Sequence, residues 1–370
     1  MQRVFTGESA IEYFYSILDE ISPTNIFLVR GKSSYKTSGA VTVITAAVVR
    51  LNCKVTEFYD FCENPRIEDL EKGLSLLSGT NADLIIGTGG GSVMDMSKLI
   101  RFFHSYTTVS ENTGYIKQKD LLPLINIPTT AGTGSEATHF AVLYKNKMKY
   151  SIEHEDILPD VAIVYPPFTY NNPKYLTACT GFDALAQAIE AYWNVNATAE
   201  SDEYALKATG LLWKNLPKVV NHPSVKTRDI VSEGSYWAGK AINITKTTAP
   251  HAFSYPFTIH YGYPHGHAVA MTFPFWADFN ISALRRLLPA KADILLSTLN
   301  INDDNVCSKF VDYINNLSLD LHLAPAISID SILSNINMER LKNNPGIINL
   351  NIDIAYQQIK KYFNNIKNEK

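Results

Sequence analysis

The stretch Leu84-Ile-Ile-Gly-Thr-Gly-Gly-Gly-Ser-Val-Met-Asp95 places three consecutive glycines between an apolar run and a helical pattern. A turn of this kind exposes backbone N–H groups at a helix N-terminus, where the helix dipole favours a pyrophosphate. Gly89, Gly90 and Gly91 have no side chain that would keep a phosphate at a distance. The stretch therefore predicts a phosphate-binding turn, although glycine clusters also occur for structural reasons and this spacing is not GxGxxG.

Short apolar runs alternate with helical segments on both sides of this turn. Candidate strands span residues 26–29, 55–59, 84–87, 124–127 and 161–164, and candidate helices span 40–51 and 92–103. After about Pro166 strand-like runs almost vanish, and a helical period takes over in 183–192, 200–213 and 228–244. The sequence predicts an α/β domain with a parallel sheet in residues 1–165 and an all-helical domain in residues 166–370.

Composition narrows the class of protein. A chain of 370 residues, 46% hydrophobic, can bury two cores. Its net charge of -3 provides no positive field for a nucleic acid or an anionic membrane. No secretory signal or membrane-spanning run is evident, so we expect a cytoplasmic protein. The four cysteines stand far apart, which favours reduced, mostly buried thiols over a disulfide framework or a zinc site.

A second loop of small and hydroxylated residues, Ile127-Pro-Thr-Thr-Ala-Gly-Thr-Gly-Ser-Glu136, also follows a candidate strand. Such residues suit hydrogen bonds to ribose and phosphate oxygens. Together with GGGSxxDxxK at residues 89–98, this loop resembles the cofactor signatures of the iron-containing (group III) alcohol dehydrogenases. The similarity implies a Rossmann-like α/β domain followed by an all-α domain, the fold shared with dehydroquinate synthase.

The resemblance also implies a nicotinamide cofactor. In that family the glycine-rich turn holds the pyrophosphate and the second loop lines the cofactor cleft. The residues that carry over to cofactor binding are Gly89, Gly90, Gly91, Ser92, Asp95, Thr129, Thr130, Thr133 and Ser135.

The choice between NADH and NADPH depends on the residue that follows a predicted strand. An acid there would bind the ribose 2′-hydroxyl and repel a 2′-phosphate. In this sequence Gly31 stands at that place, between Arg30 and Lys32 and before Ser33. We expect NADPH, while a merely basic turn that still accepts NADH remains an alternative.

The resemblance implies a divalent metal, Fe²⁺ or Zn²⁺, that polarises the substrate carbonyl. Asp183, His251 and His265 match three of the family's four ligands. Gln187, four residues after Asp183 and on the same helical face, stands where the family has a histidine. An amide oxygen is a poorer ligand than imidazole for these metals. Gln187 therefore binds weakly through oxygen, is replaced by a water, or marks a site without metal.

Other polar residues near these ligands are candidates for proton transfer and substrate binding. Tyr255 stands where the family commonly has another histidine, and His267 is a candidate proton relay. Lys240, Asn243 and Lys246 form a cationic approach that suits a doubly charged anion such as a phosphonate, and Lys246 is also a candidate catalytic residue. The alternative for both lysines is a solvated charge near a helix end.

This stretch looks like that of the phosphonoacetaldehyde reductase branch of the family. The resemblance implies reduction of phosphonoacetaldehyde, a small aldehyde, to 2-hydroxyethylphosphonate by a homo-oligomer, commonly a dimer. The alternatives are a generic alcohol or aldehyde dehydrogenase, a dehydroquinate synthase-like cyclase or lyase, and a non-catalytic nucleotide-binding relative.

Overall fold

The computed structural model describes residues 1–108, 114–146, 148–302, 305–324, 327–336, 338–345 and 352–368. The chain forms two compact units, Met1–Asn172 and Pro173–Lys370. Residues 166–172, which the sequence assigned to the second domain, belong to the first unit. Asn172 donates its side-chain amide to the carbonyl of Thr129 in that unit. In the described part of the chain no helix is both long and apolar enough to cross a membrane.

The first unit is built on a six-stranded parallel sheet with the order β1-β10-β7-β4-β2-β3. Its strands are β1 (Arg3–Thr6), β2 (Asn25–Arg30), β3 (Lys54–Phe58), β4 (Leu84–Gly89), β7 (Leu124–Pro128) and β10 (Val161–Val164). Five of them were predicted from their apolar runs. The sixth, β1, is short and half-exposed, and it pairs with β10, which lies far along the chain.

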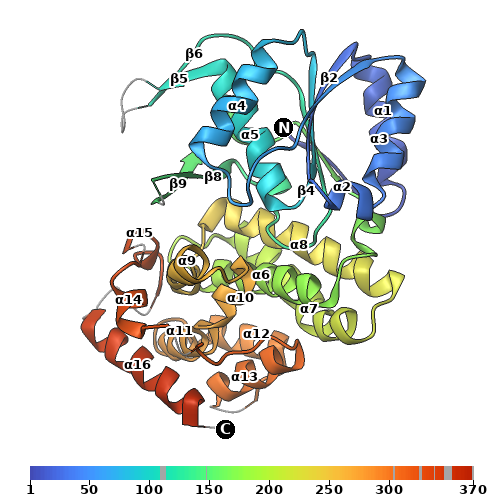
Figure 1. Cartoon of the computed structure of the whole chain (residues 1–370). Helices are drawn as coiled ribbons and strands as arrows, with labels where there is room; N and C mark the ends of the chain where they lie inside the picture. The colour runs from blue at the N-terminus through green and yellow to red at the C-terminus, as the bar shows by residue number, and fades with distance from the viewer. Residues whose placement is uncertain are drawn as a thin grey trace. The chain divides into compact units, whose positions relative to one another are not determined.

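Helices cover both faces of this sheet (Figure 1). On one face lie α1 (Ala10–Ile21) and α3 (Ala40–Leu51), and on the other lie α4 (Ile67–Ser78) and α5 (Gly91–Ser105). Phe14 and Ile44 share a buried cluster with Leu28 on the first face, while Leu70 and Leu99 pack with residues of the second face. Burial on both faces explains why the central strands read as continuous apolar runs.

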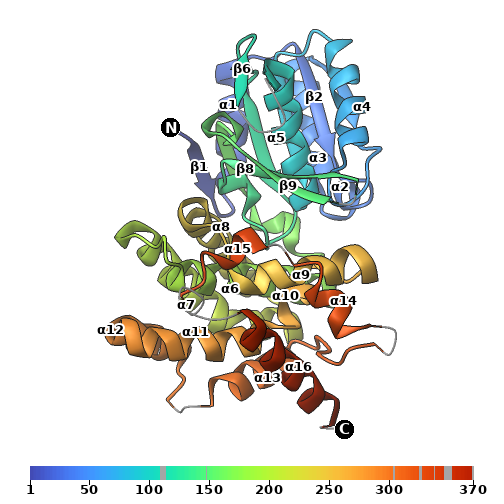
Figure 2. The ribbon, with the colours of Figure 1, turned by 90° about the vertical axis from the view of Figure 1, so that its left-hand side faces the viewer.

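Smaller elements complete the first unit. They are α2 (Ser34–Thr37), the short helices η1 (Ser135–Ala137), η2 (Glu155–Ile157) and η3 (Pro166–Thr169), and two antiparallel pairs, β5 (Tyr106–Thr108) with β6 (Tyr115–Lys117) and β8 (Phe140–Lys145) with β9 (Met148–Glu153). Figure 2 shows the β8–β9 pair beside α5. These pairs were not predicted: β5 and β6 have three residues each and β9 is largely polar, while the apolar run of β8 was overlooked.

The strand register brings three loops together at the carboxyl edge of the sheet. Arg30 pairs with Thr88, and Gly89 pairs with Pro128, so β2, β4 and β7 end side by side. The backbone N–H of Gly31 donates to the Thr88 carbonyl at 3.1 Å, and that of Thr129 donates to the Gly89 carbonyl at 2.8 Å. This edge lies where the strand order reverses, which is where α/β sheets bind nucleotides.

In the described part of the second unit every regular element is a helix. The helices are α6 (Lys174–Trp193), α7 (Ala199–Asn221), α8 (Val225–Thr245), α9 (Ala249–Tyr261), α10 (His265–Ala270), α11 (Phe273–Leu287), α12 (Pro289–Leu299), α13 (Val306–Asn316), α14 (Ile329–Leu333), α15 (Met338–Leu341) and α16 (Ile352–Asn368). The expected parallel-sheet α/β unit followed by a helical unit is therefore confirmed.

Helix α6 is the buried centre of this unit and packs against α7, α8 and α10 (Figure 1). Glycines allow the close approach: a Cβ added at Gly181 would lie 2.2 Å from Leu216 Cδ1, and one at Gly266 would lie 1.9 Å from the Cys179 carbonyl oxygen. Capping boxes at Thr198 and Ser224 begin α7 and α8.

The expectation of mostly buried thiols was wrong. All four cysteines are free, as expected, but only Cys179 is buried. Cys53 and Cys307 are partly exposed. Cys62 is exposed because it lies in the loop after β3, outside the packed elements.

Candidate functional site

The glycine-rich turn joins β4 to α5, as predicted. A Cβ added at Gly89 would lie 2.5 Å from Val93 Cγ2, and one at Gly91 would lie 2.5 Å from Thr133 Cγ2. Gly89 and Gly91 are therefore required by the packing of the chain itself. At Gly90 the nearest atom would be Thr130 Oγ1 at an ordinary 3.6 Å, and φ of −79° suits any residue. Gly90 is thus the glycine that leaves room for a ligand.

The second loop lies against this turn. Thr129 is fully buried, and its Oγ1 has no hydrogen-bond partner within the described residues. Thr130 and Thr133 are the neighbours that a Cβ on Gly90 or Gly91 would meet. Ser92 accepts a hydrogen bond from the backbone N–H of Asn64 at 3.0 Å. The loop thus provides hydroxyl groups around the open face of Gly90, which suits phosphate oxygens.

The side chains of Asp95 and Ser135, both predicted to bind the cofactor, contact each other inside the protein. Ser135 Oγ donates to Asp95, whose other carboxylate oxygen accepts from the backbone N–H of Val142 at 2.9 Å. The fully buried Lys98 donates to Ser135 Oγ at 2.9 Å and to Thr138 Oγ1 at 2.9 Å. We therefore assign Asp95 and Ser135 to a network that holds the second loop and β8. Lys98 was not singled out from the sequence, although it is the last residue of the quoted motif.

At the end of β2 the basic residues are partly neutralised. Arg30 donates to the Glu57 carboxylate at 2.7 Å and lies over the Tyr59 ring at 3.7 Å. Lys32 pairs with Asp60 at 3.4 Å, and both side chains are exposed. Ser33 precedes α2 as its N-cap residue.

A larger residue at Gly31 would require the Ser34 side chain to move. An added Cβ at Gly31 would lie 1.9 Å from Ser34 Oγ. The hydroxyl of Ser34 therefore occupies the place from which an acidic side chain would extend.

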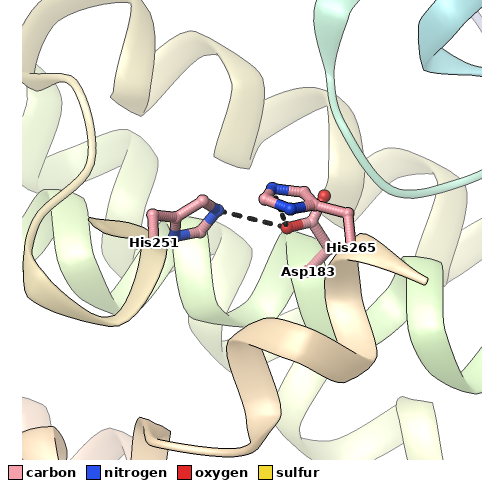
Figure 3. A group of neighbouring side chains, drawn as sticks. All are labelled: Asp183, His251 and His265. Atoms are coloured by element: carbon pink, nitrogen blue, oxygen red, sulfur yellow. Dashed lines mark hydrogen bonds and ion pairs between the residues drawn. The ribbon is translucent and has the colours of Figure 1, made fainter. Parts of the chain in front are cut away.

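The three predicted metal ligands converge (Figure 3). Asp183 comes from α6, His251 from α9 and His265 from α10, and one ligand atom of each lies within 4.8 Å of the others. Asp183 Oδ1 is 3.2 Å from His251 Nε2 and 3.8 Å from His265 Nε2. Two imidazoles and a carboxylate with open positions form a donor set for Fe²⁺ or Zn²⁺.

Gln187 completes this cluster on the next turn of α6. Its Nε2 donates to Asp183 Oδ2 at 3.2 Å, while its Oε1 is buried and accepts no hydrogen bond within the described part of the chain. A buried acceptor without a partner is costly unless something fills its coordination. The residues present thus fit a divalent metal, and the buried, unsatisfied Oε1 keeps Gln187 as the candidate for a fourth ligand.

Glu190 was missed as a functional residue. Its fully buried carboxylate accepts from His251 Nδ1 and from the backbone N–H and the hydroxyl of Thr248. This contact fixes the ring and leaves Nε2 directed at Asp183. Burial opposes a charge on His251, but Glu190 and Asp183 outweigh it and raise the pKa of His251 to about 10. The site is therefore built to stabilise positive charge. Glu190 lies seven residues after Asp183, two helical turns along the same face, which is the signal that could have revealed it.

Tyr255, a candidate hydrogen-bond donor, and His267, the candidate proton relay, differ in their surroundings. Tyr255 is buried, and its ring lies parallel to that of His265 with centroids 6.2 Å apart. His267 contacts Tyr175 Oη through Nδ1 at 2.8 Å and donates from Nε2 to the Asp320 carbonyl at 2.7 Å. Burial lowers the pKa of His267. Both ring nitrogens of His267 thus have partners that hold α10 in place, and its role as a proton relay stays a prediction.

The three predicted substrate residues lie along the last turns of α8. Lys240 Nζ is 5.3 Å from the centroid of the Tyr204 ring, and Asn243 is half-buried. Lys246 follows the helix as its C-cap residue with φ 65° and ψ −173°. That conformation is essentially restricted to glycine and costs about 1–3 kcal/mol for other residues.

The fold, with its nucleotide-binding turn and its metal cluster, is that of a metal-binding dehydrogenase. The comparison with known proteins agrees with this class. Residues 1–166 match the family model for iron-containing alcohol dehydrogenase, and residues 177–358 match the model for the C-terminal part of the Fe-containing alcohol dehydrogenase family. The chain belongs to the iron-containing alcohol dehydrogenase family, whose members are NAD-dependent oxidoreductases.

Individual relatives support this assignment. The chain is 36% identical to long-chain-alcohol dehydrogenase 1 of Geobacillus thermodenitrificans over 244 residues. These residues are 64% of this chain and 62% of that protein. It is 30% identical over 288 residues to an alcohol dehydrogenase of Thermococcus barophilus, 75% of each chain. The matches to the first two curated relatives span only 62% and 60% of their lengths.

Solved structures also match over the whole length of the chain. The sulfoacetaldehyde reductase of Bifidobacterium kashiwanohense in complex with NAD⁺ is 28% identical and superposes with a TM-score of 0.84. The superposition covers 100% of this chain and 97% of that chain.

Proposed function

We propose that this protein is a metal-dependent reductase that uses NAD(P)H to convert a small anionic aldehyde to its alcohol. The observation that carries the proposal is the convergence of Asp183, His251 and His265 with the unsatisfied Oε1 of Gln187. We further propose phosphonoacetaldehyde as the substrate and 2-hydroxyethylphosphonate as the product.

The reaction adds one hydride and one proton to the carbonyl group. Asp183, His251, His265 and Gln187 would hold a metal there, and that metal would supply Lewis-acid polarisation of the carbonyl group. Glu190 keeps His251 in the orientation that directs Nε2 into the site. A reduced nicotinamide would supply the hydride to the carbonyl carbon, and water or a ribose hydroxyl would supply the proton to the oxygen. Tyr255 is buried beside His265, where its phenol contributes to the shape and polarity of the metal site.

The proposed substrate class is supported by the lysines of α8 and by one relative. Lys240 and Lys246 bring positive charge to the helix that leads to the metal ligands, which suits a phosphonate. One solved structure of the same fold is a sulfoacetaldehyde reductase, and sulfoacetaldehyde carries a tetrahedral anionic group close to its aldehyde. A phosphonate presents a similar shape with a larger charge.

We also propose NADPH as the preferred cofactor. Gly31 provides no carboxylate for a ribose 2′-hydroxyl, and Ser34 fills the place of one. Initial rates with both cofactors at subsaturating concentrations test this directly. A preference for NADH of about tenfold or more would contradict the proposal.

The substrate test compares phosphonoacetaldehyde with propionaldehyde, a neutral aldehyde of similar length. We expect kcat/KM to be about 30-fold or more higher for the phosphonate, because a charge-assisted contact is lost with the neutral compound. Equal values would make the protein a generic aldehyde reductase. No net oxidation of the nicotinamide with any aldehyde would favour the cyclase or the non-catalytic alternative.

A further inference from the structure

The two histidines of the metal cluster present the same ring nitrogen to Asp183. His251 Nε2 lies 3.2 Å from Asp183 Oδ1, and His265 Nε2 lies 3.8 Å from the same atom (Figure 3). The centroids of the two rings are 5.3 Å apart. In each ring the other nitrogen, Nδ1, is left for a partner outside the cluster. That partner decides which of the two nitrogens carries the proton.

For His251 the partner of Nδ1 is the buried carboxylate of Glu190. An ionised carboxylate can only accept hydrogen bonds, so His251 carries a proton on Nδ1. In the neutral ring Nε2 then keeps its lone pair. This is the form that a metal ligand needs, because a histidine binds an ion through a nitrogen that carries no proton.

For His265 the partner of Nδ1 is a serine hydroxyl. Ser254 lies on α9, three residues after His251, and its fully buried Oγ is 3.5 Å from His265 Nδ1. The same hydroxyl donates its single proton to the carbonyl of His251 at 2.7 Å. A carbonyl oxygen can only accept, so Ser254 Oγ has only its lone pairs to offer to His265. The proton between these two groups therefore comes from His265 Nδ1.

This hydroxyl ties the second histidine to the main chain of the first. Ser254 belongs to α9, whereas His265 begins α10, three residues beyond the end of α9. The side chain of His265 is 31% exposed, while that of His251 is only 4% exposed. Because the ring of His265 is less enclosed by protein, its orientation depends more on individual hydrogen bonds than that of His251 does.

We propose that Ser254 is the positioning residue for His265. Its hydroxyl accepts from Nδ1, selects the form of the ring that has its proton there, and leaves Nε2 as the atom that binds the metal. Ser254 thus has the part for His265 that Glu190 has for His251. This inference rests on the proposed function, because it concerns the metal site that the reaction would use. Loss of such a partner typically weakens metal binding by about 10–100-fold.

The first test is the Zn²⁺ affinity of the full-length protein, measured by competition with a chromophoric chelator. Ser254→Ala removes one buried oxygen, and we expect the dissociation constant for Zn²⁺ to rise by about tenfold or more. Ser254→Thr keeps the hydroxyl, which in a helix can make the same bond to the carbonyl of residue 251. Its dissociation constant should stay within about threefold of the native value.

Ser232→Ala is the matched control for the loss of a buried serine hydroxyl. Ser232 lies in the middle of α8, and its buried Oγ has no hydrogen-bond partner within the described residues. This variant should bind Zn²⁺ as tightly as the native protein does.

The second test reads the ring of His265 directly. In Zn²⁺-loaded protein with isotope-labelled histidines, NMR distinguishes a metal-bound ring nitrogen from one that carries a proton. We expect Zn²⁺ on Nε2 and a proton on Nδ1 in the native protein and in Ser254→Thr. In metal-free Ser254→Ala we expect His265 to show both neutral forms, whereas the metal-free native protein shows one. Zn²⁺ on Nδ1 of His265 in the native protein would overturn the inference.

The outcomes separate this inference from the proposed function. If Ser254→Ala binds Zn²⁺ as tightly as the native protein, Ser254 is not the positioning residue, although the proposed function stands. Equal losses of affinity in Ser254→Ala and Ser254→Thr would show that packing matters and not the hydroxyl, and would also overturn the inference. If Ser254→Ala weakens Zn²⁺ binding as expected but the native protein reduces no aldehyde, the inference holds and the proposed function is wrong.

Discussion

Gln187 is the residue at which the metal cluster departs from the family pattern, and its chemistry can be tested directly. Replacing it with histidine supplies an imidazole, a better ligand for Zn²⁺ and Fe²⁺ than an amide oxygen. We expect Gln187→His to lower the dissociation constant for Zn²⁺ by about tenfold or more in calorimetric titration of metal-free protein. Gln187→Leu, which removes the ligand at similar volume, should weaken binding. Equal affinity of Gln187→Leu and the native protein would show that Gln187 is not a ligand.

The buried Glu136, in η1 after β7, should make the stability of the folded protein depend on pH. Burial raises its pKa to about 7, and the nearby Lys98 only partly opposes this. Because the folded state holds the proton more tightly than the unfolded state, this contribution to stability is present below about pH 4.5 and is lost as the pH rises through about 7.

We therefore expect Glu136→Gln to gain stability relative to the native protein as the pH rises. Between about pH 5 and pH 8 the difference in free energy of unfolding should change by on the order of 3 kcal/mol, measured by denaturant titration. The exposed Glu63, changed to glutamine, is the control and should show no such trend. A pH-independent difference at Glu136 would mean that this carboxyl group has an ordinary pKa in the folded protein.

Individual residues also show how far sequence reasoning reached. Asp183, His251 and His265 were predicted from the resemblance to the family's ligand pattern, and the structure brings them together. His267 was expected to transfer protons, but Tyr175 and the Asp320 carbonyl occupy its ring nitrogens. The type of a residue and its position in the sequence show which chemistry it can perform. Its hydrogen-bond partners come from elements that are distant in the sequence, so they could not be predicted.

At the scale of elements, the turn between β4 and α5 distinguishes glycines needed for packing from a glycine needed for a ligand. Gly90→Ala should fold normally, because its Cβ has ordinary contacts, but it should weaken NADPH binding by about tenfold or more in fluorescence titration. Gly91→Ala is the matched variant: its Cβ would overlap Thr133, and we expect a loss of about 1–3 kcal/mol in stability. If Gly90→Ala binds NADPH as tightly as the native protein, the cofactor does not lie over this glycine.

The strands that were predicted and those that were missed differ in how much of each strand is buried. The strands β2, β4 and β7 are buried on both faces, so local apolar runs revealed them. The β8–β9 pair has mostly exposed or half-exposed residues and is held by backbone pairing and by the Asp95–Lys98 network. Of this pair only Ala141 and Leu143 are fully part of the buried cluster beside α5, which leaves a short apolar signal in β8 and none in β9.

At the scale of the whole molecule, the two units carry different parts of the proposed reaction. The first contains the nucleotide-binding turn, and the second contains the metal ligands and Lys246. The fold of each unit followed from apolar periodicity and from family resemblance. The substrate could not be derived in the same way, because it depends on a few side chains around one cluster.

The measurement that tests the central claim most directly is the rate of NADPH oxidation with phosphonoacetaldehyde, before and after removal of metal by a chelator. We predict that metal removal lowers the rate by about a hundredfold or more, that Fe²⁺ or Zn²⁺ restores it, and that NADPH binding is unchanged throughout. A metal-free protein that keeps its full rate would contradict the role assigned to Asp183, Gln187, His251 and His265.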